Sequence, residues 1–276
     1  MSDKVLGIIA GEGRFPFLVA EKAAGRGMGK CGLGFAGFTR PDFSDRVDAY
    51  LEIKIGQLSK MLSFFKKQGV TDVVFAGGIN KPRALDMRPD FRAMKMLMRA
   101  GSKGDDALLR AVAAEIESEG MKVVSPLTVL PELGTPEGVL SRRGPKPHEL
   151  EDLRFGWERA KALGQWDIGQ ALMLRSKMVG ALEGMEGTDA MIRRGGDLLG
   201  KGGIVVKVCK PGQDKRLDLP AVGLETIQNM IEAGATCLGV EAGKSLFFDL
   251  KESMALADGE GVCVVGLSDA FLDGAQ

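Results

Sequence analysis

The chain has 276 residues, 45% of them hydrophobic, which is enough for one large domain or two ordinary domains with separate cores. Its 37 basic and 37 acidic side chains balance, so the basic face that nucleic-acid binding needs is not expected. His148 is the only histidine, which argues against a histidine base or a histidine metal site, and no run of about 20 apolar residues predicts a membrane span. The four cysteines are widely spaced and no secretory signal is evident, so we expect reduced thiols in a cytoplasmic protein.

Strand and helix signals alternate in the first half of the chain. Short apolar runs predict strands, and segments with apolar residues at helical spacing follow them. The predicted strands are residues 4–11, 31–38, 70–78 and 121–126, and the predicted helices are 15–27, 55–69, 92–101 and 105–120. This alternation indicates an α/β domain with a parallel sheet covered on both faces.

The second half has a different pattern. Residues 133–150 are rich in proline, glycine and charge, which predicts a linker between a first domain, residues 1–132, and a second domain, residues 151–276. Beyond the linker the predicted elements are two strands around a turn in 168–184, strands at 203–210, 235–242, 244–250 and 262–267, and helices at 188–199, 224–234 and 251–258. Gly-Lys-Ser at 243–245 lies between two of these strands and is interpreted as a hairpin turn. We therefore expect a mixed α/β domain that does not repeat the first.

Two glycine turns follow strands of the first domain. The first contains Gly11, Glu12 and Gly13, but Pro16 stands where a dinucleotide fingerprint would continue toward its third glycine. The second contains Gly78, Ile79, Asn80 and Lys81. Ligands of open parallel sheets lie beyond the carboxyl ends of the strands, so these turns are candidates for contact with a phosphate or nucleotide. Ordinary strand-to-helix turns are the alternative.

A charged loop follows the apolar strand at 203–210. Asp214 and Asp218 flank Arg216 between two prolines, and Lys207 belongs to the preceding strand. Carboxylates on a braced loop are the ligands that a hard divalent cation prefers, and arginine binds phosphate oxygens in bidentate fashion. A surface turn whose charges neutralise one another is the alternative. Thr188 begins a predicted helix and has the same two interpretations, as a helix cap or as a phosphate contact.

Phe91, Met94 and Met98 form part of a dense run of methionine and phenylalanine in the first domain. Core packing explains most such runs. An adaptable groove for an acyl chain is the other interpretation.

Five motifs in order along the chain identify a resemblance: "IIAGEGRFP", "GGINKP", "EGTDAMIRR", "VVKVCKPGQDKRLDLPAVGLETI" and "VEAGKSL". Together they resemble the UDP-2,3-diacylglucosamine pyrophosphatases of bacteria that lack the calcineurin-like enzyme for the same step of lipid A biosynthesis. The resemblance implies a hydrolase that cleaves UDP-2,3-diacylglucosamine to UMP and 2,3-diacylglucosamine 1-phosphate (lipid X). It also implies two unlike domains, the first Rossmann-like and the second, a mixed α/β domain, specific to the family.

The same resemblance implies roles for individual residues. Asp218 would be the essential carboxylate, with Asp214 as a second ligand of Mg²⁺ or Mn²⁺ and with Arg216 and Lys207 in the catalytic machinery. The substrate-binding residues would be Gly11, Glu12, Gly13, Gly78, Ile79, Asn80, Lys81, Thr188, Asp189 and Gln213. The expected partner is a lipid-linked nucleotide sugar, with peripheral contact with the inner membrane and a homodimer as further expectations. A nucleotide-sugar-lipid sensor without hydrolysis is the alternative, whereas the broken glycine fingerprint weakens a nicotinamide-dependent oxidoreductase.

Overall fold

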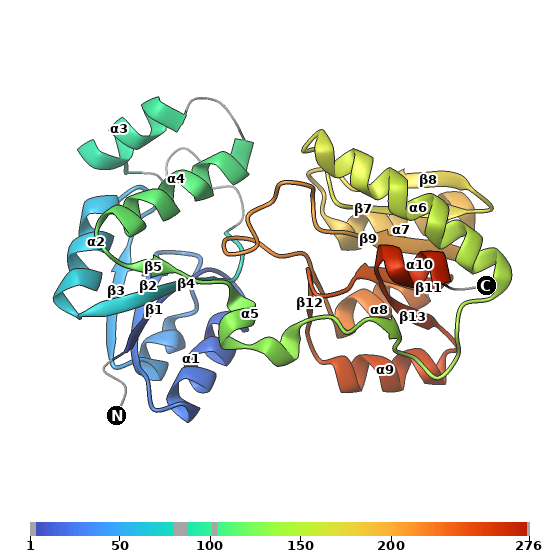
Figure 1. Ribbon diagram of the computed structural model, residues 1–276, viewed down its shortest axis with the longest axis horizontal. Helices are drawn as coiled ribbons and strands as arrows, with labels where there is room; N and C mark the ends of the chain where they lie inside the picture. Colours follow the sequence, from blue (N-terminus) through green and yellow to red (C-terminus); the bar gives the residue numbers. More distant parts are fainter. Residues whose placement is uncertain (1–3, 80–87, 101–103, 275–276) are drawn as a thin grey trace. The chain divides into compact units, whose positions relative to one another are not determined.

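The computed structural model describes residues 4–79, 88–100 and 104–274 (Figure 1). The chain divides into two compact units, Met1–Pro131 with Asp214–Asp218, and Glu132–Gln213 with Leu219–Gln276. The segment 133–150, which the composition predicts to be a linker, lies in the second unit and contains a short strand and the start of a long helix. The short segment Asp214–Asp218 follows second-unit residues in the sequence and yet packs with the first unit.

The first unit is built on a parallel sheet with the strand order β3-β2-β1-β4-β5. Its strands are β1 (Val5–Ala10), β2 (Gly29–Phe35), β3 (Ala49–Ile53), β4 (Val70–Ala76) and β5 (Lys122–Val123). Its helices are α1 (Phe15–Gly25), η1 (Pro41–Arg46), α2 (Leu58–Lys67), α3 (Phe91–Ala100), α4 (Gly104–Ser118) and α5 (Pro126–Val129), and η3 (Pro131–Leu133) runs on into the second unit. This confirms the Rossmann-like parallel sheet.

Helices cover both faces of this sheet, as Figure 1 shows with α2, α3 and α4 on one side and α1 on the other. The main core joins side chains of α2, α3 and α4 to Ile9, Leu33 and Val73 of the strands. Strand β3 was not predicted, because its half-exposed sequence "AYLEI" lies at the sheet edge and lacks the apolar run of the inner strands.

The second unit contains a six-stranded mixed sheet with the order β6-β13-β11-β9-β7-β8. Strands β9, β11 and β13 are parallel to one another, and β6, β7 and β8 are antiparallel to their neighbours. Its strands are β6 (Gly138–Val139), β7 (Ala171–Arg175), β8 (Met178–Leu182), β9 (Gly203–Lys207), β11 (Ala235–Glu241) and β13 (Cys263–Leu267). Its helices are α6 (Pro147–Gln165), α7 (Thr188–Leu199), α8 (Leu224–Glu232), α9 (Leu250–Gly259) and α10 (Asp269–Gly274). The predicted mixed α/β second domain is confirmed.

Alternate residues of β9 pack against different helices. Val205 faces the cluster built by α7, α8 and α9, whereas Ile204 and Val206 face α6 and α10. The sheet is therefore covered on both sides, which explains its nearly unbroken apolar strands. A separate two-stranded sheet pairs β10 (Ala221–Val222) with β12 (Leu246–Phe247) in parallel. The predicted hairpin at 243–245 is therefore wrong, because β11 and β12 belong to different sheets.

Among the described residues, no helix is both long enough and apolar enough to cross a membrane.

Candidate functional site

The two glycine turns of the first unit meet at the carboxyl edge of its sheet. Ala10 ends β1 opposite Gly34 of β2 and Ala76 of β4, so the loops after these strands leave from the same edge. The Gly11 amide donates to the Ala76 carbonyl over 2.8 Å, and the Glu12 amide donates to the Gly78 carbonyl over 2.8 Å. The two glycine turns therefore face each other within the first unit.

Gly11 is required by this close approach. A Cβ atom at Gly11 would lie 2.3 Å from the Gly78 carbonyl oxygen and 2.4 Å from that of Gly77, and both of these are backbone atoms. Gly13 has a φ of 80° and leads into α1, whose first turn contains Pro16 and no acidic side chain. The turns therefore bring backbone, rather than side chains, to the strand ends where a phosphate would lie. Ile79 is exposed beside them, whereas Asn80 and Lys81 lie outside the described residues.

The charged loop pairs its own acid and base. The Arg216 Nε donates to Asp214 Oδ1 over 3.0 Å and its Nη2 donates to Oδ2 over 2.7 Å, while Nη1 donates to Glu117 of α4 over 2.7 Å. These hydrogen bonds and the arginine charge hold the pKa of Asp214 below its usual value, although partial burial opposes them. Asp214 and Arg216 are thus brought together as an ion pair.

Hydrophobic anchors fix the rest of this loop. Leu217 is buried in the core of the first unit, and the Ser125 hydroxyl, two residues after β5, donates to the Lys215 carbonyl over 3.0 Å. The loop therefore lies at the same carboxyl edge as the glycine turns. Asp218 is exposed between the buried residues Leu217 and Leu219.

The second unit contains a separate chain of hydrogen bonds at the end of β9. Buried Lys207 donates from Nζ to the Thr188 hydroxyl over 2.8 Å and to the Ala221 carbonyl over 2.7 Å. The Thr188 hydroxyl donates to Glu183, which also accepts from the Gln170 amide over 3.0 Å. Lys207 and Thr188, both predicted from the sequence, are therefore in direct contact.

Two other predicted residues of the second unit have different surroundings. Asp189 Oδ1, in the first turn of α7, is buried without a hydrogen-bond partner in the part of the chain that the structure describes. An unpartnered buried oxygen of this kind is unusual and is compatible with a donor supplied by a ligand. The side-chain oxygen Oε1 of Gln213 accepts from the Lys210 backbone amide over 3.1 Å and contacts the Cys209 thiol at 3.4 Å, so the Gln213 side chain braces the start of the charged loop.

A buried glutamate at the end of β11 was not predicted as a site residue. Glu241 accepts from Lys161, from Lys244 over 2.8 Å and from the Cys209 amide over 2.8 Å. The hydrogen bond that Lys244 donates to Glu241 raises the pKa of Lys244. The available signal was the acid that ends a strand in "VEAGKSL" with a lysine three residues later, but its partner Lys161 is 80 residues away.

A divalent cation such as Mg²⁺ needs oxygen ligands, which carboxylates can supply. Among the residues that the structure describes, no group of three or more histidine, cysteine, aspartate or glutamate side chains could hold a metal ion. Both oxygens of Asp214 accept hydrogen bonds from Arg216, and its role as a metal ligand stays a prediction. The exposed carboxylate of Asp218 fits the common Mg²⁺ arrangement in which one or two protein carboxylates are completed by substrate phosphates.

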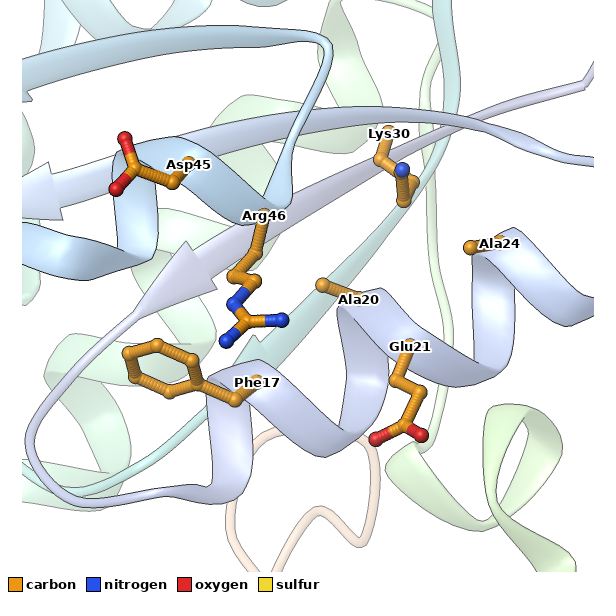
Figure 2. Close-up of a pocket in the computed structure, with 7 residues that line it drawn as sticks. All are labelled: Phe17, Ala20, Glu21, Ala24, Lys30, Asp45 and Arg46. Atoms are coloured by element: carbon orange, nitrogen blue, oxygen red, sulfur yellow. The ribbon is translucent and has the colours of Figure 1, made fainter.

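A surface pocket of about 450 Å³ lies elsewhere in the first unit (Figure 2). It is lined by Phe17, Ala20, Glu21, Ala24, Lys30, Asp45 and Arg46. In Figure 2 the Arg46 side chain points toward α1 and lies near the Phe17 ring. None of the predicted site residues lines this pocket, so it adds nothing to the candidate site.

The chain matches known proteins over almost its whole length. Residues 5–133 match the family model of the LpxI N-terminal domain, and residues 136–265 match that of the LpxI C-terminal domain. A curated protein of Caulobacter vibrioides (strain ATCC 19089 / CIP 103742 / CB 15), named UDP-2,3-diacylglucosamine pyrophosphatase LpxI, is 36% identical over 278 residues. The match covers 95% of this chain and 97% of that protein.

Solved structures are much less similar. The biotin carboxylase domain dimer of the Hydrogenobacter thermophilus 2-oxoglutarate carboxylase is 11% identical with a TM-score of 0.27, and the match covers 63% of this chain and 35% of that chain. A Rhizobium etli pyruvate carboxylase structure is 8% identical with a TM-score of 0.27, covering 62% of this chain and 15% of that chain. These scores carry no argument about this protein. The two domain matches and the full-length identity confirm the resemblance predicted from the motifs: the chain belongs to the LpxI family.

Proposed function

We propose that this protein hydrolyses the pyrophosphate bond of UDP-2,3-diacylglucosamine, releasing UMP and 2,3-diacylglucosamine 1-phosphate, a step of lipid A biosynthesis. The observation that carries the proposal is the identity of 36% to the Caulobacter pyrophosphatase over 95% of this chain. The expected substrate is a lipid-linked nucleotide sugar.

In the proposed reaction, water attacks the phosphorus nearer the sugar. A new oxygen–phosphorus bond forms, the bond from that phosphorus to the bridging oxygen breaks, and the bridging oxygen leaves with UMP. The carboxylate of Asp218, an exposed residue between two buried leucines, would orient the water and accept its proton. Arg216 is already bonded to Asp214 and Glu117, which favours a role in positioning the loop over direct contact with a phosphate.

The amides of the glycine turns in the first unit would contact substrate phosphates. Lys207, Thr188 and Asp189, all in the second unit, stay predicted contacts of the substrate. We also propose a requirement for Mg²⁺ or Mn²⁺, with Asp218 as the protein ligand and substrate phosphates completing the coordination. Such an ion, when bound, would withdraw electron density from the attacked phosphorus. Peripheral contact with the inner membrane and a homodimer are further expectations of the same proposal.

The direct test is product analysis in water enriched in ¹⁸O. Attack nearer the sugar places the label in 2,3-diacylglucosamine 1-phosphate, whereas attack on the other phosphorus places it in UMP. Tight binding of the substrate with neither product would instead support the sensor, which the name of the relative does not favour.

A further inference from the structure

Helix α3 exposes an apolar ridge. Phe91 and Met98 are each 83% exposed and Met94 is 51% exposed. The three residues are spaced by three and four positions, so they lie along one face of the helix. Large apolar side chains that are exposed side by side are unusual on a protein surface and mark a contact with another molecule or a membrane.

The core does not account for this ridge. The opposite face of α3 already buries Ala93 and Met96 in the core of the first unit. Asp90 caps the start of the helix by accepting from the Ala93 amide over 2.9 Å. The helix thus has a packed face and a defined start without any contribution from the ridge.

The charges beside the ridge are basic. Lys95 and Arg99 are exposed one residue after Met94 and Met98 respectively, and neither forms an ion pair with another of the described residues. In contrast, the third base of the helix, Arg92, is neutralised by Glu115 and Glu119 of the neighbouring segment. Apolar side chains flanked by lysine and arginine on a short amphipathic helix match the surface of an anionic bilayer.

We propose that α3 docks the protein on an anionic lipid bilayer. Phe91, Met94 and Met98 enter the boundary between headgroups and acyl chains, and Lys95 and Arg99 bind lipid phosphates. The inference extends the proposed function, because a lipid-linked substrate is met at a membrane, but the surface features stand without it.

Two other occupants fit the ridge less well. A second copy related by a two-fold axis would bring Lys95 and Arg99 of both copies to one interface, which gathers like charges there. A single acyl chain needs a concave site that covers it, whereas Phe91 and Met98 are exposed on a convex helix face.

The test is co-sedimentation of the full chain with vesicles that contain no substrate. Vesicles of phosphatidylglycerol with phosphatidylcholine are expected to bind the protein, and pure phosphatidylcholine is expected to bind it weakly. Phe91→Ser with Met98→Ser should lower the affinity about tenfold or more, because two apolar side chains no longer leave water. Lys95→Glu with Arg99→Glu should lower it by a similar factor and remove the preference for the anionic lipid.

Matched controls separate the ridge from general surface effects. Met185→Ser removes an equally exposed methionine, 88% exposed, from the second unit, and Lys60→Glu reverses an exposed charge on α2. Both should bind vesicles like the wild type, and circular dichroism should show all variants folded. Equal binding by wild type and ridge variants, or no binding to anionic vesicles, would overturn the proposal.

Two further results would also overturn it. If the ridge variants bind vesicles normally but change the mass of the particle in light scattering, the ridge is an interface between copies. If they bind vesicles normally but raise the KM for detergent-dispersed substrate, the ridge is an acyl contact. Since the vesicles contain no substrate, failure of membrane docking and failure of the proposed hydrolysis are seen in separate experiments.

Discussion

Arg216 joins Asp214, two residues before it, to Glu117, which lies 99 residues away on α4. One guanidinium therefore holds the charged loop to a helix of the first unit. This arrangement gives Asp214 and Arg216 a structural role, because the two are hydrogen-bonded to each other and Arg216 also to Glu117. It also leaves Asp218, four residues after Asp214, as the exposed carboxylate of the loop.

The ion pair between Asp214 and Arg216 should make the free energy of unfolding depend on pH in the acid range. Because Arg216 lowers the pKa of Asp214 in the folded state, the pair stabilises the protein above the unfolded pKa of aspartate, near 4. That contribution is lost as the pH falls from about 4 through the lowered pKa. Urea unfolding of the wild type and of Arg216→Gln between pH 7 and pH 2.5 would measure it. We expect a difference of at most about 1 kcal/mol at pH 7 that vanishes in acid, since the pair is partly exposed. A difference that is constant with pH would contradict the ion pair.

The hydroxyl of Thr188 should matter for stability as well as for the site. Thr188→Val removes a partner from both Lys207 and Glu183 and is expected to cost about 1–3 kcal/mol in the free energy of unfolding. Thr188→Ser keeps the hydroxyl and is the matched control, with a loss below about 1 kcal/mol. Denaturant unfolding of the three proteins measures this, and equal stability of the valine and serine variants would show that the hydrogen bonds are not formed.

The close approach of the two glycine turns predicts that alanine substitutions at Gly11 and Gly25 have very different effects on turnover. Gly11→Ala places a Cβ against backbone carbonyls, so the turns must separate, and we expect at least a tenfold loss of turnover, up to about a hundredfold. Gly25→Ala, at the end of α1 with no atom within 4 Å of the added Cβ, should retain activity and change stability by less than about 1 kcal/mol. Steady-state kinetics of both variants tests this, and full activity of Gly11→Ala would show that the close approach is not required.

Glu241 should behave as a buried anchor. Glu241→Gln weakens the hydrogen bonds from Lys161, Lys244 and the Cys209 amide, and we expect a loss of about 1–3 kcal/mol in thermal or chemical unfolding. Glu260→Gln changes an exposed glutamate and should stay within about 0.5 kcal/mol of the wild type. Similar small effects of both substitutions would mean that the buried network contributes little.

The inner strands of both sheets could be predicted from the sequence, because each is an apolar run bounded by glycine or charge. The first glycine turn and part of the second, Gly78 and Ile79, could also be placed at a strand end, since parallel strands bring their carboxyl ends to one edge. The edge strand β3 and the two-residue strands β6 and β10 could not, because partly exposed or very short segments carry no periodic signal.

The sequence predicted individual site residues, but it did not predict which of them form hydrogen bonds or ion pairs with one another. Lys207 and Thr188 were both predicted as site residues, but only the fold shows that Lys207 donates a hydrogen bond to Thr188. Asp214 was predicted to be a metal ligand, and its pairing with Arg216, together with the contact of Arg216 with Glu117, could not be assigned from spacing alone. The packing of Asp214–Asp218 with the first unit depends on Leu217 and Ser125, which are ordinary residues in the sequence.

The most direct test of the proposed hydrolysis compares the wild type with Asp218→Asn. UMP release from UDP-2,3-diacylglucosamine is measured with Mg²⁺ and with EDTA, and substrate binding is measured in parallel. We expect the wild type to release UMP with Mg²⁺ and not with EDTA. In the Asp218→Asn variant, which should fold and bind the substrate, we expect the rate of UMP release to fall about a hundredfold or more. Release of UMP by Asp218→Asn at the wild-type rate, or binding by the wild type with no UMP in either condition, would contradict the account.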